Sequence, residues 1–400
     1  MRFNRYPSDW RIDGFGDIVQ STSLGTPERG GGHKNITLVK MGCLRWGDVC
    51  IDDAEEIDES YASGYPAAVL RDGDFLFNTR NTSELVGKSA VWHLETKAMC
   101  DNNILVARMR DPVNPDFICM QMCFGRPRAR LHAISCGSTS VAAIYWKDLE
   151  QFPVFYPSRA VQDQIVSLIN HWSKAIEAID QKLSRHRMLM NGLMQKLLDG
   201  KKRFPGFTKP WRKLTVGDVA EERTVRNQGR LGTVAVRAVN KFEGMIPMKE
   251  QVMADDLSRY QVVRQHWFAY NPMRINIGSI CQWTQQDEAL VSPDYVVFRC
   301  RDEVIDHRYF NAFRRSHRWS SFMESAGAGG VRVRIYFSDL ALMSIPLPDL
   351  TEQRRIADLF EAADREISIL ERLLVAYQNQ KKGLMQQLLT GKRRVKVQAA

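Results

Sequence analysis

The sequence lacks several features that would mark other classes of protein. It has no run of 18 apolar residues, which is about the length a helix needs to cross a bilayer. Its first residues, MRFNRYPSDWRIDGFGD, lack the apolar centre of a signal peptide, so we expect the chain to remain in the cytoplasm. These two absences argue against a membrane or secreted protein.

The eight cysteines form no C-x-x-C pair. Cys119, Cys123 and Cys136 lie near His132 in the sequence, but a zinc site would need a second well-spaced pair of ligands. We therefore expect reduced, partly buried thiols and no metal site.

Motifs for nucleotide chemistry are also missing. There is no G-x-x-x-x-G-K-[ST] motif, and the glycine-rich stretch 326–330 is followed by a strand-like alternation, VRVR, where a cofactor loop would lead into a helix. The stretch YNPMR (270–274) resembles the N-P-P-aromatic motif of adenine methyltransferases, but Met273 and Arg274 replace the second proline and the aromatic residue. Two isolated acidic pairs, at 52–53 and 255–256, fit solvated loops better than a nuclease site. We expect no catalytic residue in this chain.

The charge balance favours a polyanionic partner. The chain has 56 Lys and Arg against 46 Asp and Glu, a formal net charge of +10 and a pI of about 9.2. Such a surplus attracts phosphates, although many basic proteins bind no nucleic acid. Four hundred residues allow two or three domains, each with its own core.

The most informative feature is an internal repeat. NGLMQKLLDGKKR (191–203) returns as KGLMQQLLTGKRR (382–394), a shift of 191 that holds without a gap from residue 144 to residue 203. Upstream the match continues with other shifts: Trp10 corresponds to Trp211, and RDGDFLFN (71–78) to RQHWFAYN (264–271). The sequence therefore predicts variable domains at 1–156 and 205–347, each followed by a fixed segment, at 157–204 and 348–400.

Each fixed segment has the apolar spacing of a coiled-coil helix, with alternating steps of four and three residues. A proline precedes each run, and Gly200 or Gly391 follows it, as is usual at helix boundaries. Because helices related by a perpendicular twofold axis run antiparallel, we expect the two helices to pack against each other in that way. The alternative is two independent amphipathic helices, each on its own domain. The expected seam residues are Ile165, Ile169, Trp172, Ile176, Ile179, Leu183, Ile356, Phe360, Ile367, Leu370 and Leu374.

The variable regions read as α+β. Short β-rich stretches such as FLFN, NILVARM, SICQW and DYVVFRC are separated by turn residues. Polar residues that can contact base edges gather after the FLFN strand and its counterpart, and again before a repeated Ile-Tyr pair. An ordinary polar turn is an equally good interpretation of any single one of them. The candidate DNA-binding residues are Arg80, Asn81, Thr82, Lys88, Ser138, Thr139, Arg274, Asn276, Arg332 and Arg334.

These patterns together resemble a known family. A long helix preceded by P-x4-Q-x2-I and ending in GLMQ-x-LL-x-GK-x-R, present twice after two dissimilar domains, is similar to the DNA-specificity (S) subunit of type I restriction-modification systems. The stretches GDFLFNTRNTSELVGKSAVW and WFAYNPMRINIGSI also resemble parts of that family's target-recognition domains.

The resemblance implies a fold and a function. The fold is two target-recognition domains in tandem pseudo-twofold repeat, separated by two long antiparallel helices. Each domain reads one half of a split, asymmetric site in double-stranded DNA, and the subunit itself catalyses nothing. Two methyltransferase (M) subunits and two restriction (R) subunits are the implied partners, and these would use S-adenosylmethionine, ATP and Mg, with no cofactor in this chain.

Two other interpretations remain open, a stand-alone DNA methyltransferase and a two-headed DNA-binding regulator. The apolar flanks of the helices are expected to bind the M subunit. On that view, removing residues 348–400 abolishes assembly but leaves both reader domains folded.

Overall fold

The computed structural model describes residues 6–30, 34–138, 140–241, 243–249, 253–327 and 334–395. These residues form two compact units: unit 1 comprises 1–180 and 373–400, and unit 2 comprises 181–372. Each unit contains a mixed α+β domain and one part of each long helix, α5 (Arg159–Leu198) and α10 (Leu350–Leu388). Among the described residues no helix is both long and apolar enough to span a membrane.

The domain of unit 1 is built on a four-stranded antiparallel sheet of order β2-β9-β5-β7. Smaller sheets have the orders β4-β3-β8, β10-β11-β6 and β1-β12. The strands are β1 (Arg11–Gly14), β2 (Val19–Leu24), β3 (Lys34–Val39), β4 (Glu55–Asp58), β5 (Phe75–Asn78), β6 (Arg80–Asn81), β7 (Ser89–Val91), β8 (Ala98–Cys100), β9 (Ile104–Met109), β10 (Cys136–Gly137), β11 (Ala142–Ala143) and β12 (Pro153–Tyr156).

The domain of unit 2 repeats the main sheet as β14-β21-β18-β19 and the two-stranded β1-β12 sheet as β13-β22. Two further pairs are β15-β16 and β17-β20. The strands are β13 (Arg212–Thr215), β14 (Ala220–Glu222), β15 (Arg237–Asn240), β16 (Gly244–Pro247), β17 (Gln261–Val263), β18 (Phe268–Tyr270), β19 (Ile280–Gln282), β20 (Ala289–Val291), β21 (Val296–Cys300) and β22 (Ser344–Leu347).

The short helices also repeat. Each domain has a helix that begins at a capping side chain: Asn114 accepts from the backbone N–H of Phe117 at the start of α2, and Asp306 accepts from that of Arg308 at the start of α7. The helices are α1 (Tyr61–Gly64), α2 (Pro115–Met122), α3 (Gly125–Ile134) and α4 (Trp146–Leu149) in unit 1, and α6 (Val216–Val219), α7 (His307–Phe313), α8 (His317–Gly327) and α9 (Phe337–Leu340) in unit 2.

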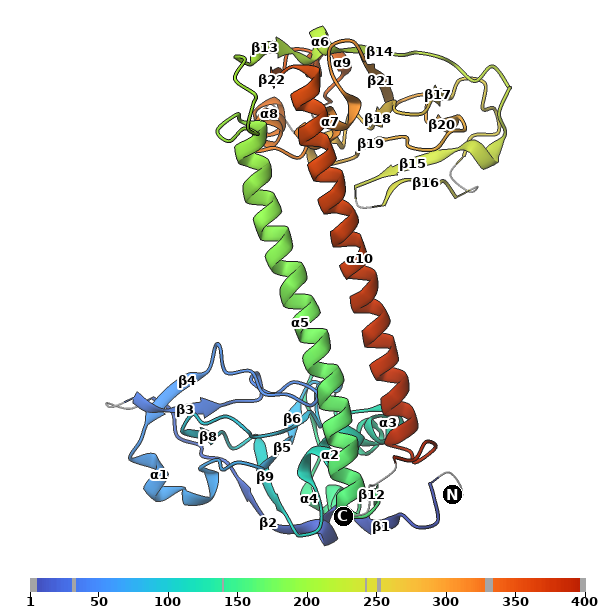
Figure 1. The fold of residues 1–400 in the computed structure, drawn as a ribbon. Helices are drawn as coiled ribbons and strands as arrows, with labels where there is room; N and C mark the ends of the chain where they lie inside the picture. The colour runs from blue at the N-terminus through green and yellow to red at the C-terminus, as the bar shows by residue number, and fades with distance from the viewer. Residues whose placement is uncertain are drawn as a thin grey trace. The chain divides into compact units, whose positions relative to one another are not determined.

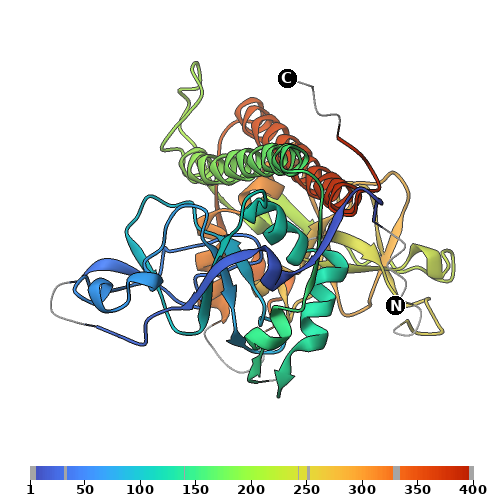
Figure 2. The same ribbon diagram turned by 90° about the horizontal axis from the view of Figure 1, so that it is seen from below.

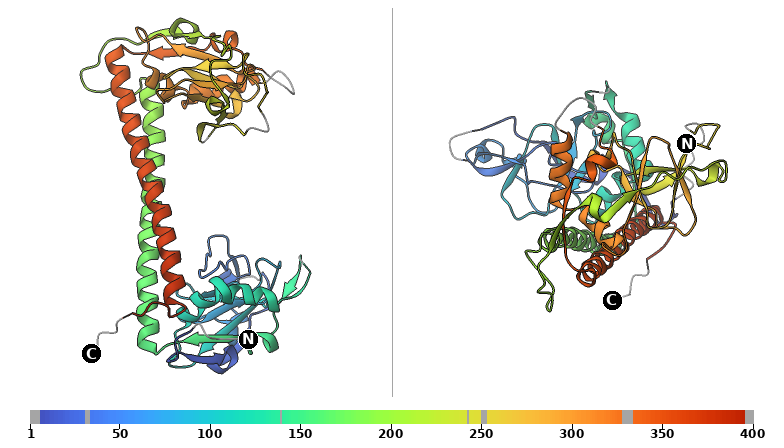
Figure 3. Two further views of the ribbon diagram at one scale, coloured as in Figure 1. Left: turned by 90° about the vertical axis from the view of Figure 1, so that its right-hand side faces the viewer. Right: turned by 90° about the horizontal axis from the view of Figure 1, so that it is seen from above.

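Within each unit the α5 and α10 segments lie side by side and run in opposite directions (Figure 1, Figure 2 and Figure 3). In unit 1 the rings of Trp172 and Tyr377 are 5.2 Å apart, centroid to centroid. In unit 2 His186 Nε2 lies 3.1 Å from a carboxylate oxygen of Glu366, and Arg187 pairs with Glu371. The predicted antiparallel pairing of the helices is therefore confirmed, rather than the alternative of two helices without a shared seam.

Both long helices end where the sequence predicts. Gly200 and Gly391 have φ of +70° and +68°, a left-handed backbone conformation that residues with a Cβ atom rarely adopt. The helices begin earlier than the apolar periodicity alone indicates: α5 starts at Arg159 and α10 at Leu350. The repeated prolines Pro157 and Pro348 precede these starts.

A buried glutamine joins the first turn of α5 to its domain. Gln162 is fully buried; its Oε1 accepts from the backbone N–H of Asn114 at 2.8 Å, and its Nε2 donates to the carbonyl of Pro157 at 2.9 Å. Since Asn114 is the capping residue of α2, this one side chain holds the start of α2 against α5.

The glutamine of the second repeat makes the same connection in unit 2. Gln353 is also fully buried, accepts from the N–H of Asp306 at 2.8 Å and donates to the carbonyl of Pro348 at 2.9 Å. Asp306 caps α7, the counterpart of α2. The Q in the repeated P-x4-Q pattern therefore has one structural role, repeated in both units.

The hydrophobic cores extend from the domains into the helices. Leu388 and Leu389 of the α10 end belong to the core of unit 1, and Ile356 and Phe360 belong to that of unit 2. Deleting 348–400 would expose apolar side chains of both cores, so we expect both domains to lose stability without this segment.

Candidate nucleic-acid interface

The polar stretch after β5 forms a loop whose base is closed by Asn78. The backbone of this buried residue donates to the carbonyl of Lys88 at 2.8 Å and accepts from the N–H of Gly87 at 2.9 Å. Its side-chain Oδ1 accepts from the N–H of Arg80 at 3.2 Å, which is an Asx turn. The loop thus leaves the sheet in a defined direction, with the Arg80 side chain exposed.

The second unit contains the same kind of Asx turn at Asn271, the residue that corresponds to Asn78. Its backbone N–H donates to the carbonyl of Ser279 at 3.2 Å, and its Oδ1 accepts from the N–H of Met273 at 3.0 Å. The following residue, Arg274, is exposed and donates its own N–H to the carbonyl of Asn271 at 2.9 Å. An Asx turn after a buried central strand therefore presents an exposed arginine in each unit.

A small sheet joins two of the predicted polar segments of unit 1. Strand β11 pairs with β6 on one side and β10 on the other, with Asn81 and Gly137 both opposite Ala142. The exposed Ser138 follows β10, and its Oγ lies 3.0 Å from that of Ser140. The Arg80–Asn81 segment and the Ser138 turn, 57 residues apart in sequence, therefore belong to one surface.

The other candidates of the first unit flank this surface. Thr82 is exposed, and its carbonyl accepts from the N–H of Leu85 at 3.0 Å in the turn that follows Asn81. Lys88 is partly buried at the foot of the loop, and burial lowers the pKa of its ammonium group below the ordinary value. Lys88 is thus less free to move than the exposed Arg80.

In unit 2 the segment around Arg274 lies beside the segment that contains Arg334. The N–H of Ile335 donates to the carbonyl of Pro272 at 3.1 Å, just as Ile144 donates to Thr79 at 3.0 Å in unit 1. Arg334 and Asn276 are exposed. Thr139 and Arg332, two further candidates, lie outside the described residues.

Sequence reasoning missed two tyrosines at these surfaces. Ile144 and Ile335 are buried, but the next residues, Tyr145 and Tyr336, have 49% and 47% of their surface exposed. Arg334 Nη1 lies 3.4 Å from the Tyr336 hydroxyl. The repeated Ile-Tyr pair beside the polar segments was the signal available in the sequence.

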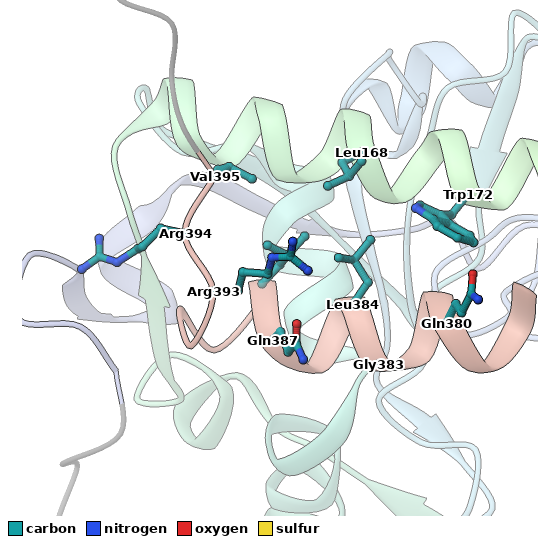
Figure 4. Close-up of a pocket in the computed structure, with 10 residues that line it drawn as sticks. Leu168, Trp172, Gln380, Gly383, Leu384, Gln387, Arg393, Arg394 and Val395 are labelled. Carbon is teal, nitrogen blue, oxygen red and sulfur yellow. The ribbon is translucent and has the colours of Figure 1, made fainter.

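The expected seam residues are all at least partly buried. Ile165, Ile169, Leu183, Ile356, Phe360 and Leu370 are buried, while Trp172, Ile176, Ile179, Ile367 and Leu374 are partly buried. Figure 4 shows Leu168 and Trp172 of α5 directed toward Leu384 of α10, around a cavity of about 580 Å³. The seam is thus less tightly filled there than in a domain core.

The cysteines near His132 do not gather into a ligand set. Cys119 and Cys123 have sulfur atoms 3.9 Å apart, while Cys136 is exposed on β10 and His132 Nδ1 lies 2.8 Å from the carbonyl oxygen of Ser83. Within the described part of the chain, no cluster of three or more His, Cys, Asp or Glu side chains is arranged to hold a metal ion.

Comparison with known proteins agrees with this architecture. Residues 274–376 match the family described as type I restriction modification DNA specificity domain. A protein named as the type I restriction enzyme MjaX specificity subunit, from Methanocaldococcus jannaschii, is 22% identical over 436 residues, covering 98% of this chain and 95% of the relative.

Solved structures show the same fold. The type I restriction-modification S subunit from M. genitalium has a TM-score of 0.59 at 10% identity, covering 97% of this chain and 98% of the other. A chain from a structural study of complex assembly and conformational transition in a type I R-M system has a TM-score of 0.56 at 17% identity, covering 97% and 99%.

The tandem α+β domains and paired long helices thus have the fold of the solved type I S subunit structures. Through the matched domain and along nearly its whole length, the chain is similar to specificity subunits of type I restriction-modification systems. The resemblance inferred from the sequence is confirmed.

Proposed function

We propose that this subunit reads a bipartite, asymmetric site in double-stranded DNA, each domain contacting one half-site. The two target-recognition domains would span 1–156 and 205–347, and the spacer segments 157–204 and 348–400. The observation that carries the proposal is the repeated Asx turn at Asn78 and Asn271, which presents an exposed arginine beside a second polar segment in each unit.

The chemistry of these surfaces suits DNA. Arginine can bind guanine edges or phosphate, and asparagine, serine and threonine can contact bases or the backbone. Tyr145 and Tyr336 add half-exposed aromatic side chains with hydroxyl groups at equivalent places. Around the turns the two units differ, with Arg80, Asn81 and Thr82 in one and Arg274 and Asn276 in the other, so the two half-sites should differ.

The spacer helices would set the distance between the half-sites. An α-helix of 40 residues, the length of α5, is about 60 Å long at 1.5 Å per residue. DNA half-sites on one face are separated by about 34–36 Å per helical turn, so such a spacer is long enough to separate two readers.

Two methyltransferase subunits and two restriction subunits would assemble on this chain. Support comes from apolar side chains of the long helices that are exposed in both units. These are Met188, Leu189, Ile369, Leu373 and Val375, all among the exposed large hydrophobic residues. The partners would supply the chemistry with S-adenosylmethionine, ATP and Mg, and this chain would bind none of them.

Sequencing of methylated adenines in the host DNA, with and without this chain, tests the proposal. The expected result is one asymmetric two-part motif that loses its methylation when the chain is deleted. A stand-alone methyltransferase would methylate DNA as a purified single polypeptide, and a two-headed regulator would bind DNA without changing any methylation. Either result would contradict the proposal.

A further inference from the structure

A basic cavity in unit 1 has a counterpart in unit 2 that is already filled by a carboxylate. The cavity, of about 520 Å³, lies between the start of α3 and the end of α10. The side chains that define its character are the cations Arg126, Arg128, Lys382 and Lys392 and the apolar residues Phe124 and Leu389.

The counterpart in unit 2 is closed by two contacts. The N–H of His317, at the start of α8, donates to Gln195 Oε1 at 2.9 Å. Asp199, at the end of α5, lies 2.9 Å from Arg318 Nε and 3.5 Å from Lys201 Nζ. One aspartate thus neutralises two cations and joins the domain to the end of the helix.

The repeat gives the equivalent residues in unit 1. A shift of 191 relates Lys201 to Lys392 and Asp199 to Thr390, and the preceding residues Phe124 and Ser316 align α3 with α8, so that Arg126 corresponds to Arg318. Both cations are therefore retained, but the carboxylate is replaced by a threonine. Among the described residues, no carboxylate lies within ion-pair distance of Arg126 or Lys392.

We infer that this cavity binds a carboxylate side chain of a partner protein, in the manner that Asp199 occupies the equivalent place in unit 2. A protein segment fits better than a DNA phosphate for two reasons. The occupant of the counterpart is a carboxylate, and Phe124 and Leu389 provide an apolar wall for the residues that flank it. The expected ligand is a short segment with an acidic residue between apolar ones.

That the partner is a methyltransferase subunit rests on the proposed function, whereas the binding chemistry does not. Because Asp199 pairs with Arg318 at the corresponding place in unit 2, a single copy of the partner would make this contact. The two repeats would then be unequal in assembly even though their helices are alike.

Fluorescence anisotropy on the full-length chain tests the inference with a labelled eight-residue peptide of alternating glutamate and leucine. Thr390→Asp and Lys392→Glu should each weaken binding about tenfold, the first by placing a carboxylate of the chain itself in the cavity and the second by removing a cation. Thr390→Asn and Lys201→Glu are the matched controls and should bind like the natural chain. Unchanged thermal unfolding of each variant would exclude a folding defect.

Several outcomes would overturn the inference. They are absence of peptide binding, equal weakening by Lys392→Glu and Lys201→Glu, equal binding of a glutamine-for-glutamate peptide, and displacement of the peptide by a random 20-base-pair duplex. If the peptide binds as expected but the chain directs no adenine methylation, the proposed function fails and the binding site stands.

Discussion

The buried carboxylate of Glu352, in the first turn of α10, accepts two hydrogen bonds from Arg203, at 2.9 Å from Nε and 2.6 Å from Nη2. Its Oε2 also accepts from the indole N–H of Trp211 at 3.0 Å. This acid therefore fastens the segment that leaves α5 and enters the second domain. The segment 203–211, which reads as a linker, is held at both ends.

The corresponding residues of the first repeat make different polar contacts. The counterpart of Glu352 is Val161, and the indole N–H of Trp10, the counterpart of Trp211, is buried without a hydrogen-bond partner among the described atoms. Arg394, which corresponds to Arg203, pairs instead with Asp9 at 2.6 Å. The segments that follow α5 and α10 thus have equivalent residues but make different polar contacts.

Replacing Glu352 should destabilise unit 2 selectively. Glu352→Val leaves Arg203 and Trp211 without their acceptor. Removing one partner of a buried ion pair leaves the other charge without compensation, so the unfolding midpoint of unit 2 should fall by about 5 °C. Glu352→Gln keeps one acceptor oxygen for Arg203 or Trp211, so it should have a smaller effect. Hydrogen–deuterium exchange of peptides from 203–222 measures the change, with peptides from unit 1 as the internal control. Equal loss of protection in both units would contradict this account.

Each exposed arginine should act on one half-site. Arg80→Ala should weaken binding about tenfold or more to DNA that carries the half-site of unit 1, and Arg274→Ala to DNA that carries the other. The measurement is a competition assay with duplexes in which one half-site at a time is randomised. Equal losses on specific and random DNA would assign both residues to phosphate contacts.

The helical part of the fold was predictable because its signal is local and repeated. Apolar steps of four and three residues indicate a coiled-coil helix wherever they occur, and Gly200 and Gly391 mark the ends through a backbone conformation that glycine favours. The strands β5, β9, β19 and β21 also lie within the β-rich stretches seen in the sequence.

The polar contacts could not be predicted because they join distant residues. Gln162 is a repeated residue, but its acceptance from the N–H of Asn114, 48 positions earlier, exists only in the folded domain. The surface shared by Arg80 and Ser138 likewise depends on β11 pairing with both neighbours. Sequence periodicity reports which face of an element is buried, and it carries no information on which two loops meet.

Salt bridges on the surface of the helix pair should help to set its register. Arg187 and Glu371 are both about half exposed, so Arg187→Glu should reduce the stability of unit 2 by only about 0.5 kcal/mol. The exchange Arg187→Glu with Glu371→Arg should restore it, since the pair is then reversed. Urea unfolding at low and high salt measures the loss of stability in the single variant and its recovery in the double variant. No recovery in the double variant would mean that the helix register does not depend on this pair.

The stability of unit 1 should fall as the pH rises through the folded-state pKa of His93, which lies above the ordinary histidine value. Burial lowers the pKa of His93, but its hydrogen bonds with Asp72 and Asp116, at 2.7 and 3.0 Å, outweigh burial and raise it above the ordinary value. Protonated His93 therefore stabilises the folded unit. This contribution is fully present below about pH 6.5, the pKa in the unfolded chain, and it disappears as the pH rises through the folded pKa.

His93→Gln should remove this pH dependence. The ring is half exposed, so solvent screening limits the effect to less than about 1 kcal/mol. The measurement is the urea midpoint of unit 1 between pH 5.5 and pH 8.5 for the natural chain and the variant. Parallel curves for the two proteins would show that another group is responsible.

Lengthening both spacer helices should lengthen the unread gap in the DNA site. Seven residues inserted after Asp180 in α5 and after Arg372 in α10, with the apolar steps maintained, add about 10 Å to each helix and keep the seam in register. At about 34–36 Å per 10–10.5 base pairs, the two half-sites should move apart by about three base pairs while their sequences stay the same. Mapping of methylated adenines in cells that carry the lengthened chain measures the gap directly. Inserting four residues into α5 alone is the control, because it breaks the register and should abolish methylation. A gap that stays constant in the seven-residue variant would mean that the helices do not determine the spacing.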